Sequence, residues 1–363
     1  MKIIHGTAAI VLLPADEPLA QGTLPPGGTR PTVVLTLGTD AGIEGIGFTF
    51  LGAGLTRALC AVVADLAQLM VGHDPLCREG LLRRAREAAG GAGPAGLFTL
   101  GLAAIDMALW DIAGKALGQP LWRLLGGSGA PVATYASGAL MRGMAEDAVA
   151  EAAARLIADG FRAMKMQLAL PGAPSVAVEL QRARAIRAAI GPDIDLMCDI
   201  NQRWRPDQAI PIGRLLEDIR FAWLEDVTAA EDFTGLARIA AALATPIAGG
   251  EYLYGIPPFR HMIAAGAVDI VMIDPFRAGG ITAWLRIAAL AEAFNLPVVS
   301  HLAPEVQVHL VGAVPNGLTV EYMPWSLRLF EEVPRPHHGM LAMPTEAGLG
   351  LRFDRAALAR FRA

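Results

Sequence analysis

The sequence predicts an α/β protein in which a closed barrel of alternating strands and helices follows a smaller α+β domain. Three observations support this prediction. A chain of 363 residues is too long for one small core. From about residue 130 onward, short apolar strands alternate with amphipathic helices. Before that point strand-like stretches come first and helical patterns follow, which is typical of an α+β domain.

The α+β domain is expected over residues 1–125. Its two predicted strands, Ile3–Leu13 and Thr32–Leu37, are separated by the Pro- and Gly-rich loop Asp16–Arg30. Three helical patterns follow, at Arg57–Met70, Leu81–Ala89 and Leu97–Leu117.

The barrel is expected over residues 126–322. Eight strand–turn–helix units within about 190 residues predict a TIM-type barrel, somewhat compact for that fold. An open, doubly wound sheet is the structural alternative. The strands are predicted at 132–137, 163–167, 195–200, 221–226, 246–251, 269–274, 297–301 and 318–322, with helices such as 144–159, 176–189 and 283–293 between them.

The last segment, 323–363, lacks this alternation. We expect it to pack back on the first domain.

Composition argues for a cytoplasmic protein without a nucleic-acid or membrane partner. The net charge is −5 with both signs mixed along the chain, so no basic surface is predicted. The odd, sparse set of cysteines (Cys60, Cys77 and Cys198) fits a reducing compartment better than a disulfide framework. The first residues are expected to form a strand rather than a signal peptide, because their apolar run is short and Pro14 ends it. No run approaches the roughly 18 apolar residues of a membrane span.

Polar side chains lie at the end of almost every predicted barrel strand. In a barrel of this kind the carboxyl ends of the strands form the active site, so these groups are expected to converge. They are Ser137, Lys165, Gln167, Asp199, Asn201, Glu225, Glu251, Asp274, His301 and Glu321.

Three of these residues predict a metal site. Asp199, Glu225 and Glu251 end the third, fourth and fifth strands. Like charges brought so close repel each other unless a cation lies among them. Oxygen ligands suit Mg²⁺, which takes a few carboxylates and keeps positions for water and substrate.

A second pair predicts a general base. Asp274 and His301 end the sixth and seventh strands, and adjacent strands lie about 4.8 Å apart. The carboxylate can therefore reach one imidazole nitrogen, which fixes the tautomer and strengthens the other nitrogen as a base.

The strand ends, taken in order, resemble the enolase superfamily and within it the mandelate racemase subgroup. The matching motifs are AMKMQ, CDINQRW, WLEDV, GGEYL, VMIDPFRAGGIT, VVSHLAPEV and LTVEY, preceded by GIEGIGFTF and LAAIDMALWDIAGKALGQPLWRLLGG. The resemblance covers nearly the whole chain. It implies a capping α+β domain, a modified (β/α)₇β barrel and an essential Mg²⁺. It also implies removal of the proton next to a substrate carboxylate, with the metal stabilising the resulting enediolate.

The resemblance assigns roles by position. Asp199, Glu225 and Glu251 match the metal ligands, with Asn201 beside the first, and Asp274 and His301 match the His–Asp dyad. Glu321 matches a residue that hydrogen-bonds the substrate carboxylate, and Ser137 is expected to touch the same group. Lys165 matches the first lysine of the family's Lys-x-Lys motif.

Gln167 is a departure from that motif, because many relatives have a second lysine at this position. Met164 to Leu168 alternate in polarity, so Lys165 and Gln167 are predicted to face the same side of one strand. An amide cannot accept a proton at neutral pH, so the face opposite the dyad lacks a base. Lys165 is expected to stabilise negative charge on the substrate, and Gln167 to hydrogen-bond a substrate hydroxyl.

A single base favours dehydration of a hydroxy acid or acid sugar over racemisation. Protonated His301 can return its proton to the leaving hydroxyl, whereas racemisation needs a second acid. A racemase, epimerase or cycloisomerase remains an alternative, as does a barrel that binds metal and carboxylate with little turnover.

We expect a small-molecule carboxylate as partner and a homo-oligomeric assembly. The lid candidates at 17–28 and 48–54 are apolar and carry Leu19, Leu24, Phe48, Phe50 and Leu51, which keeps a less polar acid open as substrate.

Overall fold

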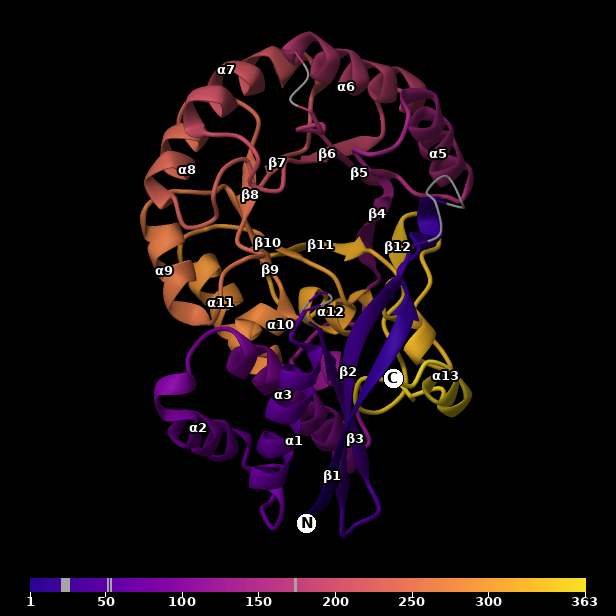
Figure 1. The fold of residues 1–363 in the computed structure, drawn as a ribbon, viewed down its shortest axis with the longest axis vertical. Helices are drawn as coiled ribbons and strands as arrows, with labels where there is room; N and C mark the ends of the chain where they lie inside the picture. Colours follow the sequence, from indigo (N-terminus) through magenta and orange to yellow (C-terminus); the bar gives the residue numbers. More distant parts are fainter. Residues whose placement is uncertain (21–26, 51, 53, 173–174) are drawn as a thin grey trace.

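The chain forms a sheet, a group of helices and a closed barrel in sequence order (Figure 1). The computed structural model describes residues 1–20, 27–50, 52, 54–172 and 175–363. The N-terminal elements lie beside the ring of barrel helices, and the last segment runs alongside both.

The capping domain begins with an antiparallel sheet of order β1-β2-β3, and helices pack against it. Its elements are β1 (Ile3–Pro14), β2 (Thr29–Thr39), β3 (Glu44–Thr49), α1 (Thr56–Met70), α2 (Arg78–Ala89) and α3 (Leu97–Leu117), with short 3₁₀ turns η1 (Pro18–Ala20) and η2 (Gly90–Ala92). By length and composition α3 could cross a membrane, but most of it is buried inside the protein, as a core helix is.

Strand β3 was not predicted from the sequence, because its glycines argue against a strand. The structure gives these glycines a packing role. A Cβ atom added at Gly45 would lie 2.3 Å from the carbonyl oxygen of Ala108, and one at Gly47 would lie 2.0 Å from that of Ala104. The glycines therefore let β3 lie directly on the backbone of α3.

The barrel is closed, which excludes the doubly wound alternative. In the described ranges, strands β4 to β11 are consecutive parallel neighbours, and β11 pairs again with β4. In the described residues, each strand from β4 to β10 is followed by a helix before the next strand begins, and β11 closes the ring by pairing directly with β4. The fold is therefore the expected (β/α)₇β barrel with an N-terminal cap. The strands are β4 (Val132–Leu140), β5 (Ala163–Gln167), β6 (Asp195–Asp199), β7 (Leu224–Glu225), β8 (Ile247–Gly249), β9 (Ile270–Ile273), β10 (Val298–Ser300) and β11 (Gly317–Tyr322).

Helices pack around the outside of this ring (Figure 1). The predicted helices at 144–159, 176–189 and 283–293 correspond to α5, α6 and α11. Among the described residues, the helices and 3₁₀ turn between α3 and β11 are α4 (Leu121–Leu124), α5 (Glu146–Ala158), α6 (Val176–Ile190), α7 (Pro206–Leu216), η3 (Glu217–Ile219), α8 (Phe233–Ala240), α9 (Ile256–Ala264), α10 (Pro275–Ala278), α11 (Ile281–Ala293) and α12 (Pro304–Val311).

A plug of large side chains fills the barrel beneath the strand ends. Tyr135, Met197, Trp223, Met272 and Val299 form a buried cluster of their own, with the Tyr135 and Trp223 rings edge to face at 5.4 Å. Inward-facing residues of neighbouring strands meet here, as in other barrels of this type. The side of the site that faces the barrel interior is therefore formed by apolar side chains.

The segment after β11 contacts both domains. It contains η4 (Leu327–Leu329), β12 (Met340–Leu341) and α13 (Arg355–Arg360). Strand β12 pairs with β4, while Phe361 accepts a backbone hydrogen bond from Leu12 of β1. The predicted boundaries at 125/126 and 322/323 fall after α4 and at the end of β11.

His309, in α12, connects three segments of the chain through hydrogen bonds of its imidazole ring. Its Nδ1 accepts the backbone N–H of Trp122, and its Nε2 donates to the carbonyl oxygen of Leu349 at 3.0 Å. The ring is fully buried, and burial lowers the pKa of His309 to about 4, although the bond to Leu349 opposes this. The imidazole is therefore neutral in the folded protein near pH 7.

This pKa predicts an acid-dependent loss of stability. The unfolded chain binds a proton at His309 below about pH 6.5 while the folded chain does not until about pH 4, so the stabilisation is present above pH 6.5 and is lost between these values. The shift corresponds to about 3 kcal/mol. Urea unfolding from pH 7 to pH 4.5 should show a shallower pH slope for His309→Gln than for the parent. The matched change at exposed His5, His5→Gln, should leave the slope unchanged; equal slopes in all three proteins would contradict the assignment.

Candidate active site

The predicted site residues all lie on a barrel strand or at most two residues beyond its carboxyl end. Direct contacts join most of them into one buried network. Ser137 is buried within β4, but among the described residues it makes no hydrogen bond to the other predicted site residues. Its strand pairs with that of Glu321, with Ala136 opposite Tyr322.

Lys165 is the central cation of the network. It is 5% exposed, and its Nζ lies 2.5 Å from Glu225 and 2.8 Å from Glu321. Burial alone would lower the pKa of Lys165, but the two carboxylates outweigh it and hold the pKa well above the usual value. Met164 and Met166 point away into the hydrophobic core, so the predicted alternation of this strand is confirmed.

Glu321 is held as an anion. Burial would raise the pKa of Glu321, but Lys165, His301 and the backbone N–H of Leu302 lower it to about 2. A substrate carboxylate would compete with Glu321 for the ammonium of Lys165.

His301 lies between two carboxylates. Its Nδ1 lies 2.7 Å from Asp274, and its Nε2 lies 3.3 Å from Glu251. The backbone N–H of Arg277 donates to Asp274 at 2.6 Å and fixes that carboxylate at the start of α10. Burial would lower the pKa of His301, but Glu251 and Asp274 raise it to about 9. Asp274 therefore orients the imidazole, while Nε2 faces Glu251 and the raised pKa keeps the ring protonated near pH 7 in this arrangement. Nε2 becomes available for proton transfer when Glu251 no longer faces it.

The acid cluster differs in one member from the predicted ligand set. Asp199, Glu225 and Asp226 bring carboxylate oxygens within 4.8 Å of one another, all in buried positions. Glu251, the predicted third ligand, lies instead against His301, so its role as a ligand stays a prediction. Asn201 fixes Asp199 through two hydrogen bonds of 2.7 and 2.6 Å.

Sequence reasoning missed Asp226, because successive residues of a strand point to opposite faces. The strand ends at Glu225, and Asp226 adopts a left-handed conformation with φ of 45°. Because of this turn, Asp226 does not follow the alternation of the strand. The side chains of Glu225 and Asp226 therefore both belong to the acid cluster. Such strain in a residue other than glycine is typical of functional sites.

The cluster fits a divalent cation. Burial and neighbouring acids raise the pKa of Glu225, and raise those of Asp226 and Glu251 well above their usual values, although Lys165 opposes this. One Asp226 oxygen is buried without a hydrogen-bond partner among the described residues. A donor set of oxygen atoms alone suits Mg²⁺.

Gln167 is held in a fixed orientation. Its Oε1 accepts the backbone N–H of Arg142 at 3.3 Å, and its Nε2 donates to Asn201 at 3.2 Å. The guanidinium of Arg142 also donates to Asn201, at 2.7 Å, and to the carbonyl of Leu168. Arg142 was not predicted, since it follows β4 in a loop without any recognisable motif.

The lid candidates are placed in part. Leu19 lies in η1, and Phe48 and Phe50 lie at and just after the end of β3. Leu24 and Leu51 lie outside the described residues.

Comparison with known proteins places the chain among enolase-like proteins. Residues 147–357 match the family model described as enolase C-terminal domain-like, and residues 14–126 match the N-terminal domain of the mandelate racemase / muconate lactonizing enzyme family.

Curated relatives match over most of their length. The L-talarate/galactarate dehydratase of Salmonella typhimurium is 29% identical over 96% of this chain and 88% of its own. The 3,6-anhydro-alpha-L-galactonate cycloisomerase of Streptomyces coelicolor is 32% identical over 88% of each chain.

Solved structures of similar proteins have the same fold as this chain. The same Salmonella dehydratase with Mg and L-lyxarohydroxamate has a TM-score of 0.92 at 29% identity, covering 100% of this chain and 93% of that one. An enolase from Bradyrhizobium complexed with magnesium and mandelic acid has a TM-score of 0.89 at 28% identity, covering 100% and 98%.

The ligand set can be tested by metal titration. Glu225→Gln removes a ligand charge and should weaken Mg²⁺ binding at least about tenfold, measured by calorimetry on chelator-treated protein. The matched change Glu231→Gln, on the same loop but exposed, should have no effect. Glu251→Gln should also weaken binding; loss of affinity in Asp226→Asn alone would replace Glu251 by Asp226 in the ligand set.

Proposed function

Because the chain belongs to the mandelate racemase / muconate lactonizing enzyme family, we propose that it is a Mg²⁺-dependent lyase that dehydrates a hydroxy acid or acid sugar. The observation that carries the proposal is an oriented base on one side of the site only. His301 follows β10 and is fixed by Asp274. Gln167 ends β5, three strands away around the closed ring.

The buried ammonium of Lys165 is the group that binds the substrate carboxylate in this proposal. Lys165 offers a positive charge, and Ser137, Asn201 and Glu321 are the proposed polar neighbours. Glu321, an anion in this structure, would have to take up a proton to donate a hydrogen bond to the substrate carboxylate. Held by Asp199, Glu225 and Glu251, Mg²⁺ would supply further positive charge beside the carboxylate while the α-carbon loses its proton. The buried, low-dielectric setting makes each of these charges more effective than it would be in water.

Proton transfer falls to His301. The step starts from neutral His301, which requires that Glu251 no longer face the ring, because this carboxylate raises the pKa of His301. Nε2 then takes the α-proton, and the resulting imidazolium returns this proton to the hydroxyl on the β-carbon. The α C–H bond and the β C–O bond break, a carbon–carbon double bond forms, and water leaves. When the α-carbon carries a hydroxyl, the enol product tautomerises to a 2-oxo acid. The balance requires no oxidant and no second base.

Cycloisomerisation is the second candidate, favoured by the similarity to the Streptomyces cycloisomerase. Mass spectrometry of the product separates the two, because dehydration yields a product lighter by one water and cycloisomerisation one of unchanged mass. We further propose that the enzyme acts in the cytoplasm, as a homo-oligomer, on a free small-molecule carboxylate.

The role of His301 predicts a separation of chemistry from metal binding. With a substrate found by screening hydroxy acids and acid sugars, His301→Asn should slow α-proton exchange about 10²–10⁴-fold, because the base is removed. Mg²⁺ affinity should be nearly intact. The control is His261→Asn, at an exposed position of α9. Exchange at the parent rate in His301→Asn would transfer the role of base to another residue, with Lys165 the first to test.

The role of Gln167 predicts strict stereochemistry. Exchange in deuterium oxide, followed by NMR, should occur for one configuration at the α-carbon, since no titratable group replaces the second lysine. Gln167→Lys should add exchange from the opposite configuration by restoring a base on that face. Comparable exchange from both configurations in the parent enzyme would refute the one-base mechanism.

A further inference from the structure

We propose that Gln307 is a positioning residue for the Asp274–His301 pair, because its side-chain amide joins the backbone of the two strand ends that carry the pair. This inference rests on the proposed function, in which His301 is the base. It assigns a role to a residue that lies outside the network of charged side chains.

The amide nitrogen of Gln307 donates to two backbone carbonyls at once. Its Nε2 lies 3.0 Å from the oxygen of Ile273 and 2.8 Å from that of His301. Ile273 is the last residue of β9 and directly precedes Asp274, whereas His301 directly follows β10. The NH₂ group has two hydrogens to donate, so each strand end that carries a member of the pair receives one.

The turn after His301 brings Gln307 into this place. Leu302 and Ala303 both adopt left-handed conformations, with φ of 57° and 44°, and α12 begins directly after them. The chain is thereby reversed, and Gln307 in the first turn of α12 lies back against the carbonyl of His301. Such strain persists where surrounding contacts over-determine the backbone. The bond from Gln307 is one of these contacts, and the bond from the N–H of Leu302 to Glu321 is another.

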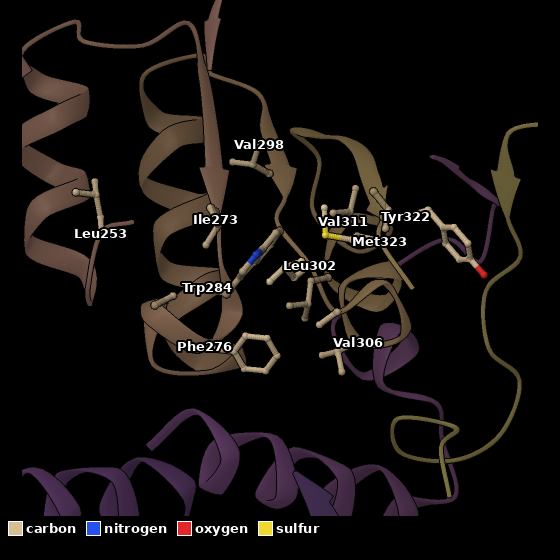
Figure 2. Close-up of a cluster of buried hydrophobic side chains, with 14 of the residues drawn as sticks. Leu253, Ile273, Phe276, Trp284, Val298, Leu302, Val306, Val311, Tyr322 and Met323 are labelled. Atoms are coloured by element: carbon tan, nitrogen blue, oxygen red, sulfur yellow. The ribbon is translucent and has the colours of Figure 1, made fainter. Parts of the chain in front are cut away.

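The surroundings of the amide are apolar. Figure 2 shows Ile273, Leu302 and Val306 in one cluster of buried hydrophobic side chains, carried by β9, the turn and α12. Gln307 is itself fully buried, and its Oε1 has no hydrogen-bond partner among the described residues. A buried polar atom without a partner is unfavourable, so packing alone would favour an apolar residue at this position. What the amide contributes is the pair of bonds to the strand ends.

These bonds fix the distance on which the orientation of the base depends. The Nδ1 of His301 lies 2.7 Å from Asp274. The backbone N–H of His301 also donates to Ile273, at a longer 3.2 Å. Without the amide of Gln307 the carbonyl of His301 loses a donor, and the two strand ends are held together less tightly at this point. A misplacement of about 1 Å is enough to slow a reaction about 10²-fold.

A spectroscopic measurement tests the positioning without a substrate. Gln307→Met keeps the length of the side chain and removes the donor. Proton NMR of the Mg²⁺-loaded protein, with isotope-labelled histidine, detects the Nδ1–H of His301 in its bond to Asp274, and absence of the signal from His301→Asn identifies it. In Gln307→Met this signal should move upfield and exchange faster with water, because the bond to Asp274 lengthens.

Asn316 offers a matched control. Its Nδ2 also donates to two backbone carbonyls, those of Ala288 at 3.0 Å and Leu296 at 2.9 Å, and its Oδ1 likewise has no partner in the part of the chain that the structure describes. Asn316 directly precedes β11, at the opposite end of the strands from the site. Asn316→Leu should lower stability in urea as Gln307→Met does, but should leave the His301 signal unchanged. An unchanged signal in both variants, or an equal shift in both, would overturn the proposal.

Turnover measures the catalytic consequence. With a substrate found by screening, Gln307→Met should lower kcat for α-proton exchange about 10- to 10²-fold with KM nearly unchanged, and Asn316→Leu should retain the parent kcat. If Gln307→Met fails to fold, Gln307→Asn takes its place. Its amide is shorter by one methylene and cannot reach both carbonyls, so the same loss of kcat is expected to a smaller degree.

The outcomes separate this inference from the proposed function. A shifted signal together with slowed exchange supports the positioning role of Gln307. Exchange at the parent rate despite a shifted signal overturns that role. A shifted signal in a protein that neither exchanges nor dehydrates any acid overturns the lyase, and leaves Gln307 as the residue that orients His301.

Discussion

The buried ammonium of Lys165 is the interaction on which the arrangement of the site depends. Glu225 and Glu321 are both fully buried, and each lies within 2.8 Å of this cation. Removing one partner from such a group leaves an uncompensated buried charge, at a cost of about 3–5 kcal/mol. Closure of the barrel makes the arrangement possible, because the pairing of β11 with β4 brings the eighth strand within reach of the second.

One ammonium does not balance the acids that surround it. Asp199, Asp226 and Glu251 are also buried, and Glu251 is stabilised from the other side by His301. The backbone is strained where the strands end, with positive φ at Asn201, Asp226 and Leu302. The fold therefore maintains both repulsion and strain along the edge where the chemistry is proposed to occur.

The features that strand order determines were predictable from the sequence. Parallel strands place their carboxyl ends together, so the pair of Asp274 and His301 was predictable without coordinates. Contacts that depend on local turns or long separations were not. Asp226 enters the cluster through a left-handed turn, β3 is a strand because its glycines pack on a helix, and Glu17 meets Trp325 across 308 positions of the chain. No periodic pattern encodes such contacts.

The aromatic contact between the cap and the barrel, in which the Phe276 ring of α10 meets Phe48 and Phe50, has two origins in the chain, and this has a consequence for redesign. On the barrel side, Phe276 and Leu302 are bound by the peptide backbone to Asp274 and His301, so a substitution there also disturbs the proton-transfer residues. On the cap side, Phe48 lies in β3 and Phe50 just after it, remote in sequence from every residue of the network. Substitutions on the cap side of this contact should therefore disturb the proton-transfer residues less than substitutions on the barrel side.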